Sequence, residues 1–408
     1  MPLTLAHVSD LHVSTFGDTF HDRARIVKRS ARLADTSASR FEEVWSEAGW
    51  RVLRERDARR TTLALIDPDG YAHPLARTSD SDLTALVAAA ADKARRLDAR
   101  RARTLAAADP GSAALARLAD VTPKNSNVRL LRAARVVVAS GVDMVAITGD
   151  LTDDGDGYEL VLSAFASHRA ANGLVAVPGN HDRYLFPLAG SGRPRATAAS
   201  KRVAWLAFAR QLGLDVHASG AWWREIPSAG VMIVGLDTSA RAQLRFFRHN
   251  GAIGAEQFSR LRELAHSPEW QRSRHRVVML HHHVVPLAHG VGRRTPSELG
   301  MRLDDAKDAA TVFNEIGVTL VMHGHRHVSE ERQPAGCKFR LLASPSLTLG
   351  CRSGDGPSFW RVELGEHVHA ARVLVPLERV DEDAVPGASV LGLPSAPSSA
   401  VLPEDDGD

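Results

Sequence analysis

Side chains able to bind a metal ion occur in five short clusters between Asp10 and His327. The candidates are Asp10 and His12, Asp150, Asn180, His281, and His325 with His327. Carboxylate and amide oxygens combined with imidazole nitrogens suit first-row metals such as Mn, Fe, Co or Zn, and do not suit an all-oxygen calcium site. One ion needs fewer than seven ligands, whereas two ions sharing a bridging carboxylate would use all of them. Paired ions about 3.5–4 Å apart are a recurring device for displacement at phosphorus. The clusters therefore predict a dinuclear metal centre.

Each cluster directly follows a short apolar run. The five runs cover residues 3–8, 142–148, 174–177, 277–280 and 318–322. Continuous apolar runs of this length are typical of strands buried on both faces. Helix-like segments at residues 127–140 and 254–266 separate some of them. We therefore expect an α/β protein with covered sheets, in which ligands gather beyond the carboxyl ends of the strands.

The stretch between His12 and Asp150 differs in character. Residues 81–108 are rich in Ala, Leu and Arg, and their apolar spacing predicts a helix capped by Asp80 or Ser81. Residues 41–60 are interpreted as a second helix and 61–66 as a strand entering a turn. We interpret residues 16–124 as a mostly helical insertion, or cap, on the side of the active site. The basic residues of its long helix fit a solvated face, and the alternative is attraction of an anionic substrate or partner.

Composition limits the remaining possibilities. The chain has 408 residues and a net charge of only +3, which argues against a protein that coats nucleic acid. Two cysteines exclude a disulfide scaffold. The first residues lack a secretory pattern and no apolar run is long enough to span a membrane, so a cytoplasmic location is expected. Residues 381–408, rich in Pro, Ser and Gly and without Lys or Arg, predict a disordered acidic tail.

The complete set of motifs resembles the calcineurin-like metallophosphoesterase superfamily. The motifs are Asp10-x-His12, Gly149-Asp150, Gly179-Asn180-His181-Asp182, His281 and Gly324-His325-Arg326-His327. Residues 149–155 and 280–286 are similar to bacterial members related to class III cyclic-nucleotide phosphodiesterases. The resemblance implies a four-layer αββα sandwich, formed by residues 1–15 and 125–380, with the dinuclear centre at the carboxyl ends of the strands.

The resemblance also implies a role for each residue. Asp10, His12 and His327 would hold the first metal, Asn180, His281 and His325 the second, and Asp150 would bridge them. His181 would contact the phosphoryl group and protonate the leaving oxygen. Asp182 is expected to orient the His181 imidazole. Asn180 and Arg326 are further candidates for contact with the substrate, although a structural salt bridge is the stronger interpretation of Arg326.

Two assignments have alternatives. Three consecutive histidines stand at the fourth motif, and we choose His281 because it directly ends the apolar run. His282 is the second candidate, whereas His283 is expected to hydrogen-bond nearby. Separately, Arg193, Arg195, Lys201 and Arg202 are interpreted as a flexible basic surface loop, with phosphate recognition as the alternative.

The predicted activity is metal-dependent hydrolysis of phosphodiester bonds. Two transition-metal ions (Mn, Fe or Zn) would activate a bridging hydroxide, and His181 would assist departure of the alcohol. A phosphomonoesterase or a nuclease on the same fold are the alternatives, and a non-catalytic scaffold is less favoured because no ligand is missing. The expected partner is a small-molecule phosphoester such as a nucleotide, rather than nucleic acid.

Overall fold

The computed structural model describes residues 2–14, 41–56, 63–66, 72–73, 82–108, 126–153, 155, 157–183, 198–239, 250–285, 303–351 and 354–376. The predicted tail at residues 381–408, together with Arg193 and Arg195 of the predicted basic loop, lies outside these ranges. All statements below concern the described residues.

The first sheet has five strands in the order β15-β14-β1-β6-β7. They are β1 (Leu3–Val8), β6 (Met144–Thr148), β7 (Leu174–Val177), β14 (Ser358–Leu364) and β15 (Val368–Leu374). β1, β6 and β7 run parallel, whereas β14 and β15 are antiparallel to their neighbours. Three of the predicted apolar runs thus form the parallel part of this sheet, and their carboxyl ends share one edge.

The second sheet has six strands in the order β12-β13-β11-β10-β9-β8. They are β8 (Trp222–Ile226), β9 (Val231–Gly235), β10 (His275–Met279), β11 (Leu320–His323), β12 (Glu330–Arg332) and β13 (Arg340–Ala343). β9, β10, β11 and β13 are parallel. The other two predicted runs, now β10 and β11, are therefore adjacent in this second sheet.

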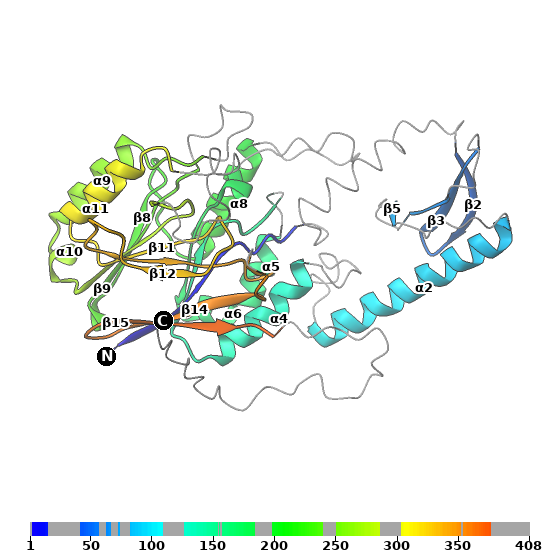
Figure 1. The fold of residues 1–408 in the computed structure, drawn as a ribbon, viewed down its shortest axis with the longest axis horizontal. Coiled ribbons are helices and arrows are strands. Elements are labelled where there is room, and N and C mark those ends of the chain that lie inside the picture. The colour runs from blue at the N-terminus through cyan, green and yellow to red at the C-terminus, as the bar shows by residue number, and fades with distance from the viewer. Residues whose placement is uncertain are drawn as a thin grey trace, which may run out of the picture. The chain divides into compact units, whose positions relative to one another are not determined.

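Helices cover the outer faces of the two sheets (Figure 1). Near the first sheet are α4 (Ser126–Ala139), α5 (Tyr158–Ala164), α6 (Ala166–Ala170), α7 (Asn180–Arg183) and α8 (Ala198–Gln211). Near the second are α9 (Ala255–Ala265), α10 (Pro268–Arg272) and α11 (Ala306–Glu315), and a short 3-10 helix at Pro227–Ala229 precedes β9. The predicted helices at residues 127–140 and 254–266 are confirmed as α4 and α9.

Alternating residues of the second sheet belong to two hydrophobic cores. Ile233 of β9 and Val277 of β10 share a core with the first sheet, α4, α5 and α8. Val234 and Val278, which point to the opposite face, pack with α9, α10 and α11. The two sheets therefore lie face to face between two helical layers. This is the predicted four-layer αββα sandwich, and the α/β fold class is confirmed.

The described segments between residues 41 and 108 form a small sheet packed against one helix. The strands are β2 (Phe41–Glu47), β3 (Trp50–Glu55), β4 (Leu63–Ile66) and β5 (Ala72–His73), paired in that order, and the helix is α2 (Leu83–Ala108). Trp50, Val52 and Leu65 of the sheet form a core with Ala90 and Ala94 of the helix.

The helix predicted at residues 41–60 is wrong, because this segment is a β-hairpin. Trp50 and Val52 are buried whereas Arg51 between them is exposed, which is the two-residue period of a strand. Ala48 and Gly49 both have positive φ, 50° and 85°, as a two-residue hairpin turn requires. The strand expected at residues 61–66 is confirmed as β4. The long helix is also confirmed, but Asp82 is its cap, since its carboxylate accepts the amides of Thr84 and Ala85.

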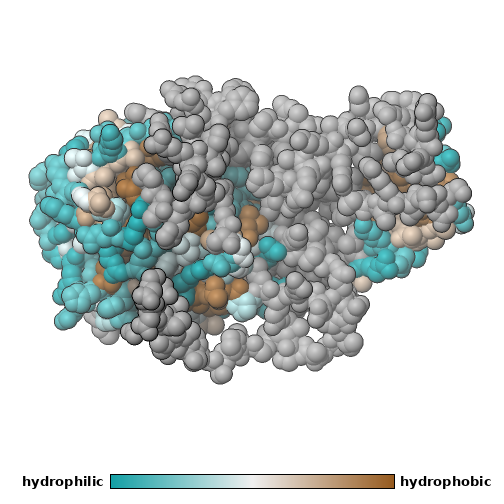
Figure 2. Space-filling model, viewed as in Figure 1, coloured by the Kyte–Doolittle hydropathy of each residue, from teal (hydrophilic) through white to brown (hydrophobic). Residues whose placement is uncertain are grey.

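The surface of the described residues in the view of Figure 2 is largely hydrophilic, with hydrophobic side chains in small separate patches. Among the described residues, the exposed large hydrophobic side chains are Val138, Val203, Trp223 and Leu374. Among the described residues, no helix combines the length and the hydropathy that a bilayer span requires.

Candidate metal centre

The predicted metal-binding residues meet where the parallel strands of both sheets end. Asp10 and His12 follow β1, Asp150 follows β6, and Asn180 follows β7 in the first sheet. His281 follows β10, and His325 and His327 follow β11, in the second sheet. Backbone hydrogen bonds from Asp10 N to Gly149 O (3.0 Å) and from His12 N to Asp150 O (2.9 Å) hold the first two segments side by side. The structure thus brings all seven residues to one edge of the sandwich.

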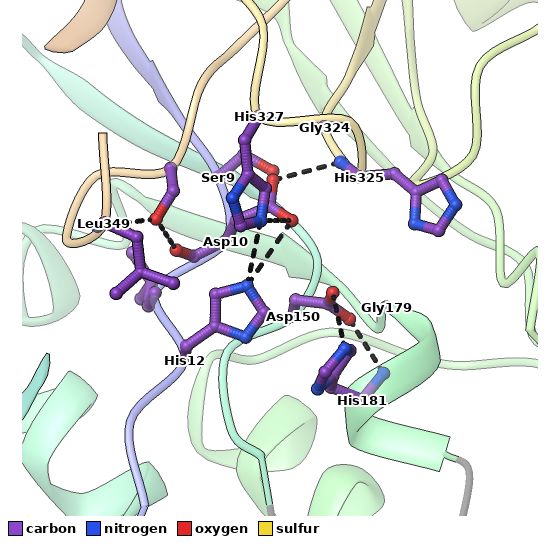
Figure 3. A network of polar contacts seen from close by, with 12 residues as sticks. Ser9, Asp10, His12, Asp150, Gly179, His181, Gly324, His325, His327 and Leu349 are labelled. Carbon is purple, nitrogen blue, oxygen red and sulfur yellow. Dashed lines mark hydrogen bonds and ion pairs between the residues drawn. The ribbon is translucent and has the colours of Figure 1, made fainter. Parts of the chain in front are cut away.

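A first group consists of Asp10, His12 and His327 (Figure 3). Nε2 of His327 lies 3.2 Å from Asp10 Oδ1 and 3.0 Å from Nε2 of His12. Nε2 of His12 lies 3.8 Å from the same carboxylate oxygen. Three potential ligand atoms therefore face one another, as predicted for the first metal.

A second group consists of Asp150, His281 and His325, with Asn180 beside them. Nε2 of His281 lies 3.3 Å from Asp150 Oδ2, 3.0 Å from Asn180 Oδ1 and 3.1 Å from Nδ1 of His325. Nδ1 of His281 donates to the carbonyl of Thr148 at 2.8 Å, a bond that joins the second sheet to the first. His281 thus reaches the site as predicted, whereas Nδ1 of His282 bonds Thr238 Oγ1 (2.7 Å).

Asp153 is a site residue that the sequence reasoning missed. Its Oδ1 lies 2.8 Å from Nδ1 of His12 and 2.8 Å from Nδ1 of His181. Nε2 of His181 points toward Asp150, with 3.9 Å to Oδ2. One buried carboxylate therefore orients both imidazoles. The available signal was the position of Asp153 three residues after Asp150, in the loop that carries the bridging candidate.

The prediction that Asp182 orients His181 is wrong. The Asp182 carboxylate accepts the amides of Gly179 (2.8 Å), Leu151 (3.0 Å) and Thr152 (2.9 Å) and the hydroxyl of Tyr158 (3.0 Å). The Asp182 carboxylate is thus hydrogen-bonded to backbone amides of the two loops that follow β6 and β7. Asp182 therefore fixes the loops, and Asp153 makes the contact with the imidazole.

The backbone at the site is strained. Among the described residues, seven other than glycine have positive φ, and five of them are predicted ligands. These five are Asp10 (53°), His12 (48°), Asp150 (50°), His325 (74°) and His327 (49°). Left-handed conformations at residues with a Cβ are rare and concentrate at functional sites, where the surrounding fold holds them in place. The strain independently marks five of the seven candidate ligands that the motifs selected.

Two glycines allow the backbone to approach the ligands closely. A Cβ at Gly179 would overlap Oδ1 and the amide nitrogen of Asp150. A Cβ at Gly324 would overlap Oγ of Ser9 and crowd the carboxylate of Asp10. Any side chain at either position would therefore displace a candidate ligand.

Burial and charge set the ionisation of the group. Burial alone would raise the pKa of Asp150, but His281 and His181 outweigh it and hold that pKa well below its usual value. Burial would lower the pKa of His281 and of His12, but Asp150 and Asp153 respectively raise them to about 9 and about 10. Burial lowers the pKa of His325 well below its usual value. The carboxylates are thus held ionised, as metal ligands must be.

The donor set fits two cations. Because a carbonyl only accepts, the bond to Thr148 O fixes the proton of neutral His281 on Nδ1 and leaves a lone pair on Nε2. That lone pair faces the oxygens of Asp150 and Asn180. Asp153 imposes the same tautomer on His12, whose Nε2 faces His327 and Asp10. The raised pKa values of His281 and His12 show that positive charge is favoured at each of these two groups of atoms, and a metal cation would displace the proton that supplies it. Nitrogen with oxygen ligands suits first-row metals.

Two other sequence candidates, Arg326 and Lys201, are buried. Arg326 is 1% exposed, which favours a structural role over contact with the substrate. Lys201 was predicted in a surface loop, but it lies in α8 with 3% exposure and bonds backbone carbonyls. Arg202 is also in α8 and is exposed. The prediction of a flexible loop is therefore wrong for these two positions.

Comparison with known families places the chain among the calcineurin-like phosphoesterases. The family model matches residues 102–329, which is more than half of the chain, and the chain belongs to this family. The family hydrolyses phosphoester bonds and binds a dinuclear metal centre, and the His and Asp groups described above fit such a centre. A search of curated proteins finds no significant match.

Two phosphatases are among the solved structures to which the chain is similar. A dimetal phosphatase from Danio rerio has 12% identity and a TM-score of 0.45, covering 92% of this chain and 100% of its own. A purple acid phosphatase from yellow lupin (Lupinus luteus) seeds has 12% identity and a TM-score of 0.41, covering 61% of this chain and 47% of its own. Similarities this distant leave the family match as the basis of the classification.

Proposed function

We propose that the protein is a metal-dependent phosphodiesterase. The observation that carries the proposal is the pair of ligand groups, Asp10–His12–His327 and Asp150–His281–His325, with His181 held beside them by Asp153. Asp10, His12 and His327 would hold one ion, Asn180, His281 and His325 the other, and Asp150 would bridge them. When bound, two divalent ions polarise phosphoryl oxygens and make hydroxide available near neutral pH.

His181 is proposed to protonate the leaving oxygen. Its side chain is 16% exposed, whereas those of Asp10 and His281 are fully buried, so it lies on the open side of the group. The contact of Nδ1 with Asp153 orients the ring and leaves Nε2 directed toward the metal ligands. A protonated Nε2 there can donate to a departing alkoxide and can stabilise charge on the phosphoryl group.

Charge supports a diester as the substrate. Two divalent ions, the carboxylates of Asp10 and Asp150, and one hydroxide leave about one positive charge. A phosphodiester carries one negative charge, so the reacting group would be close to neutral. Asp153 does not alter this balance at the phosphorus, because its charge is paired with the imidazoles of His12 and His181.

The test compares aryl phosphate diesters and monoesters. Purified protein loaded with Mn²⁺ should hydrolyse bis-p-nitrophenyl phosphate faster than p-nitrophenyl phosphate, and Asp150→Asn should abolish both activities. Asp143→Asn is the control, because the Asp143 carboxylate accepts two hydrogen bonds from Thr4 but lies at the start of β6, away from the candidate ligands. A faster rate on the monoester would assign the protein as a phosphomonoesterase instead. Activity that survives in Asp150→Asn would overturn the metal mechanism.

A further inference from the structure

Lys201 is an unusually buried lysine on α8. Lysine is almost never fully buried unless its ammonium group is paired. Here the side chain is 3% exposed, and it shares the buried face of the helix with Trp205 and Phe208. The Phe208 ring lies 4.8 Å from the ring of Tyr158 in α5. These aromatic contacts hold α8 against the domain and so set the position of the Lys201 backbone.

The ammonium group of Lys201 connects two loops that carry site residues. Nζ donates to the carbonyl of His181 at 2.6 Å and to the carbonyl of Asp153 at 3.0 Å. Asp153 follows β6 and His181 follows β7. The pairing of these strands ends at Thr148 and Val177, so the lysine joins the two segments beyond the end of the strand ladder. The side chains of the same two residues contact each other at 2.8 Å. The lysine thus fixes the backbone on both sides of that contact.

Gly155 provides the space for the lysine side chain. It has φ of +82°, and a Cβ there would lie 2.7 Å from Cγ of Lys201. Both the conformation and the space therefore exclude a larger residue. The loop after β6 therefore packs against the Lys201 side chain at Gly155, and this contact joins the loop to α8.

We propose that Lys201 is a positioning residue: its ammonium group holds the backbones of Asp153 and His181 at the separation that their side-chain contact requires. The inference rests on the proposed function, since orientation of His181 matters for activity only if His181 acts on the leaving group. Phosphate recognition by Lys201 does not fit, because the side chain is buried and its donors are directed to backbone carbonyls. Misplacement of a reacting group by about 1 Å can cost a hundredfold in rate.

The first test is kinetic. Lys201→Met should lower kcat on an aryl phosphodiester by about tenfold to a hundredfold with little change in KM, whereas Arg202→Met should leave both unchanged. The loss should be larger for a phenyl ester than for a nitrophenyl ester, because the poorer leaving group depends more on proton donation. A loss of general stability or of metal would reduce both rates by the same factor. Equal losses, or an unchanged kcat, would overturn the proposal.

A double-mutant cycle tests the connection to His181. If Lys201 acts through the imidazole, adding Lys201→Met to His181→Ala should cost little beyond His181→Ala alone. Fully additive losses would show that the lysine acts elsewhere. Gly155→Ala provides a second variant if Lys201→Met does not fold, because the added methyl group displaces the lysine stem. It should show the same dependence on the leaving group, and an unselective effect would count against the inference.

Hydrogen exchange separates this inference from the proposed function. Lys201→Met should speed amide exchange in the segments 150–155 and 179–183 relative to Arg202→Met, with or without metal. Faster exchange in a protein that hydrolyses no phosphoester would refute the proposed function while retaining the positioning role. Unchanged exchange in these segments would refute the positioning role whatever the activity.

Discussion

Replacement of Asp153 by asparagine is expected to damage the chemistry while sparing the fold. The carboxylate makes two 2.8 Å contacts with imidazole nitrogens, one on His12 and one on His181, and is 1% exposed. The two histidines outweigh the effect of burial and hold the pKa of Asp153 far below its usual value. Asparagine keeps the shape and one acceptor but removes the charge that stabilises both rings.

The size of the effect follows from these two contacts. A charge-assisted hydrogen bond contributes about 1.5–3 kcal/mol and a neutral one about 1 kcal/mol, so each contact weakens by about 1 kcal/mol. The contact with His181 therefore accounts for about 1 kcal/mol, or about a fivefold fall in kcat, and the contact with His12 accounts for a similar loss in metal binding. The assay is steady-state hydrolysis of an aryl phosphodiester, with metal content measured on the same sample.

Metal content is needed because His12 is a proposed ligand. A variant that binds two ions per chain and has a lowered kcat would locate the defect at His181. A variant that binds fewer ions would locate it at His12. Asp143→Asn should change neither quantity. Full metal content with an unchanged kcat would show that Asp153 does not orient the imidazole, and the assignment of His181 would have no structural basis.

Three further predictions concern stability, close approach and ligand choice. Asp182→Ala should lower the free energy of unfolding by about 2–4 kcal/mol in urea, because the amides of two loops lose a shared acceptor; unaltered stability would contradict this role. Gly324→Ala should reduce metal content below two ions per chain, measured by elemental analysis, because its Cβ crowds Asp10. His281→Ala should abolish metal binding at one site, whereas His282→Ala should retain both ions, and the reverse result would exchange the two assignments.

The candidate ligands could be selected from the sequence because few arrangements of side chains can form such a site. An apolar run that stops at Asp150 or His281 must end at the edge of a covered sheet, and parallel strands place such ends together. The choice among three histidines followed from the sequence pattern, since His281 directly ends the apolar run at residues 277–280. An apolar run in the sequence does not predict which way a side chain points in the loop that follows it.

Asp153 and Asp182 illustrate that limit. Both are aspartates three or fewer residues from a predicted site residue, and nothing in their spacing says which one faces the imidazole. The difference arises from loop conformation, since the Asp182 carboxylate turns back to the amides of Gly179 and Thr152. The hairpin at residues 41–55 was missed for a related reason. The turn depends on positive φ at Ala48, where alanine gives no signal.

The left-handed backbone at five candidate ligands links the stability of the fold to metal binding. Each such residue costs about 1 kcal/mol or more relative to a relaxed conformation, a noticeable part of the 5–15 kcal/mol by which domains are typically stable. Ions that bind only the folded chain offset that cost by mass action. A chain stripped of its cations would therefore carry the strain uncompensated and melt at a lower temperature. The metal concentration would then affect the lifetime of the folded protein as well as its catalytic rate.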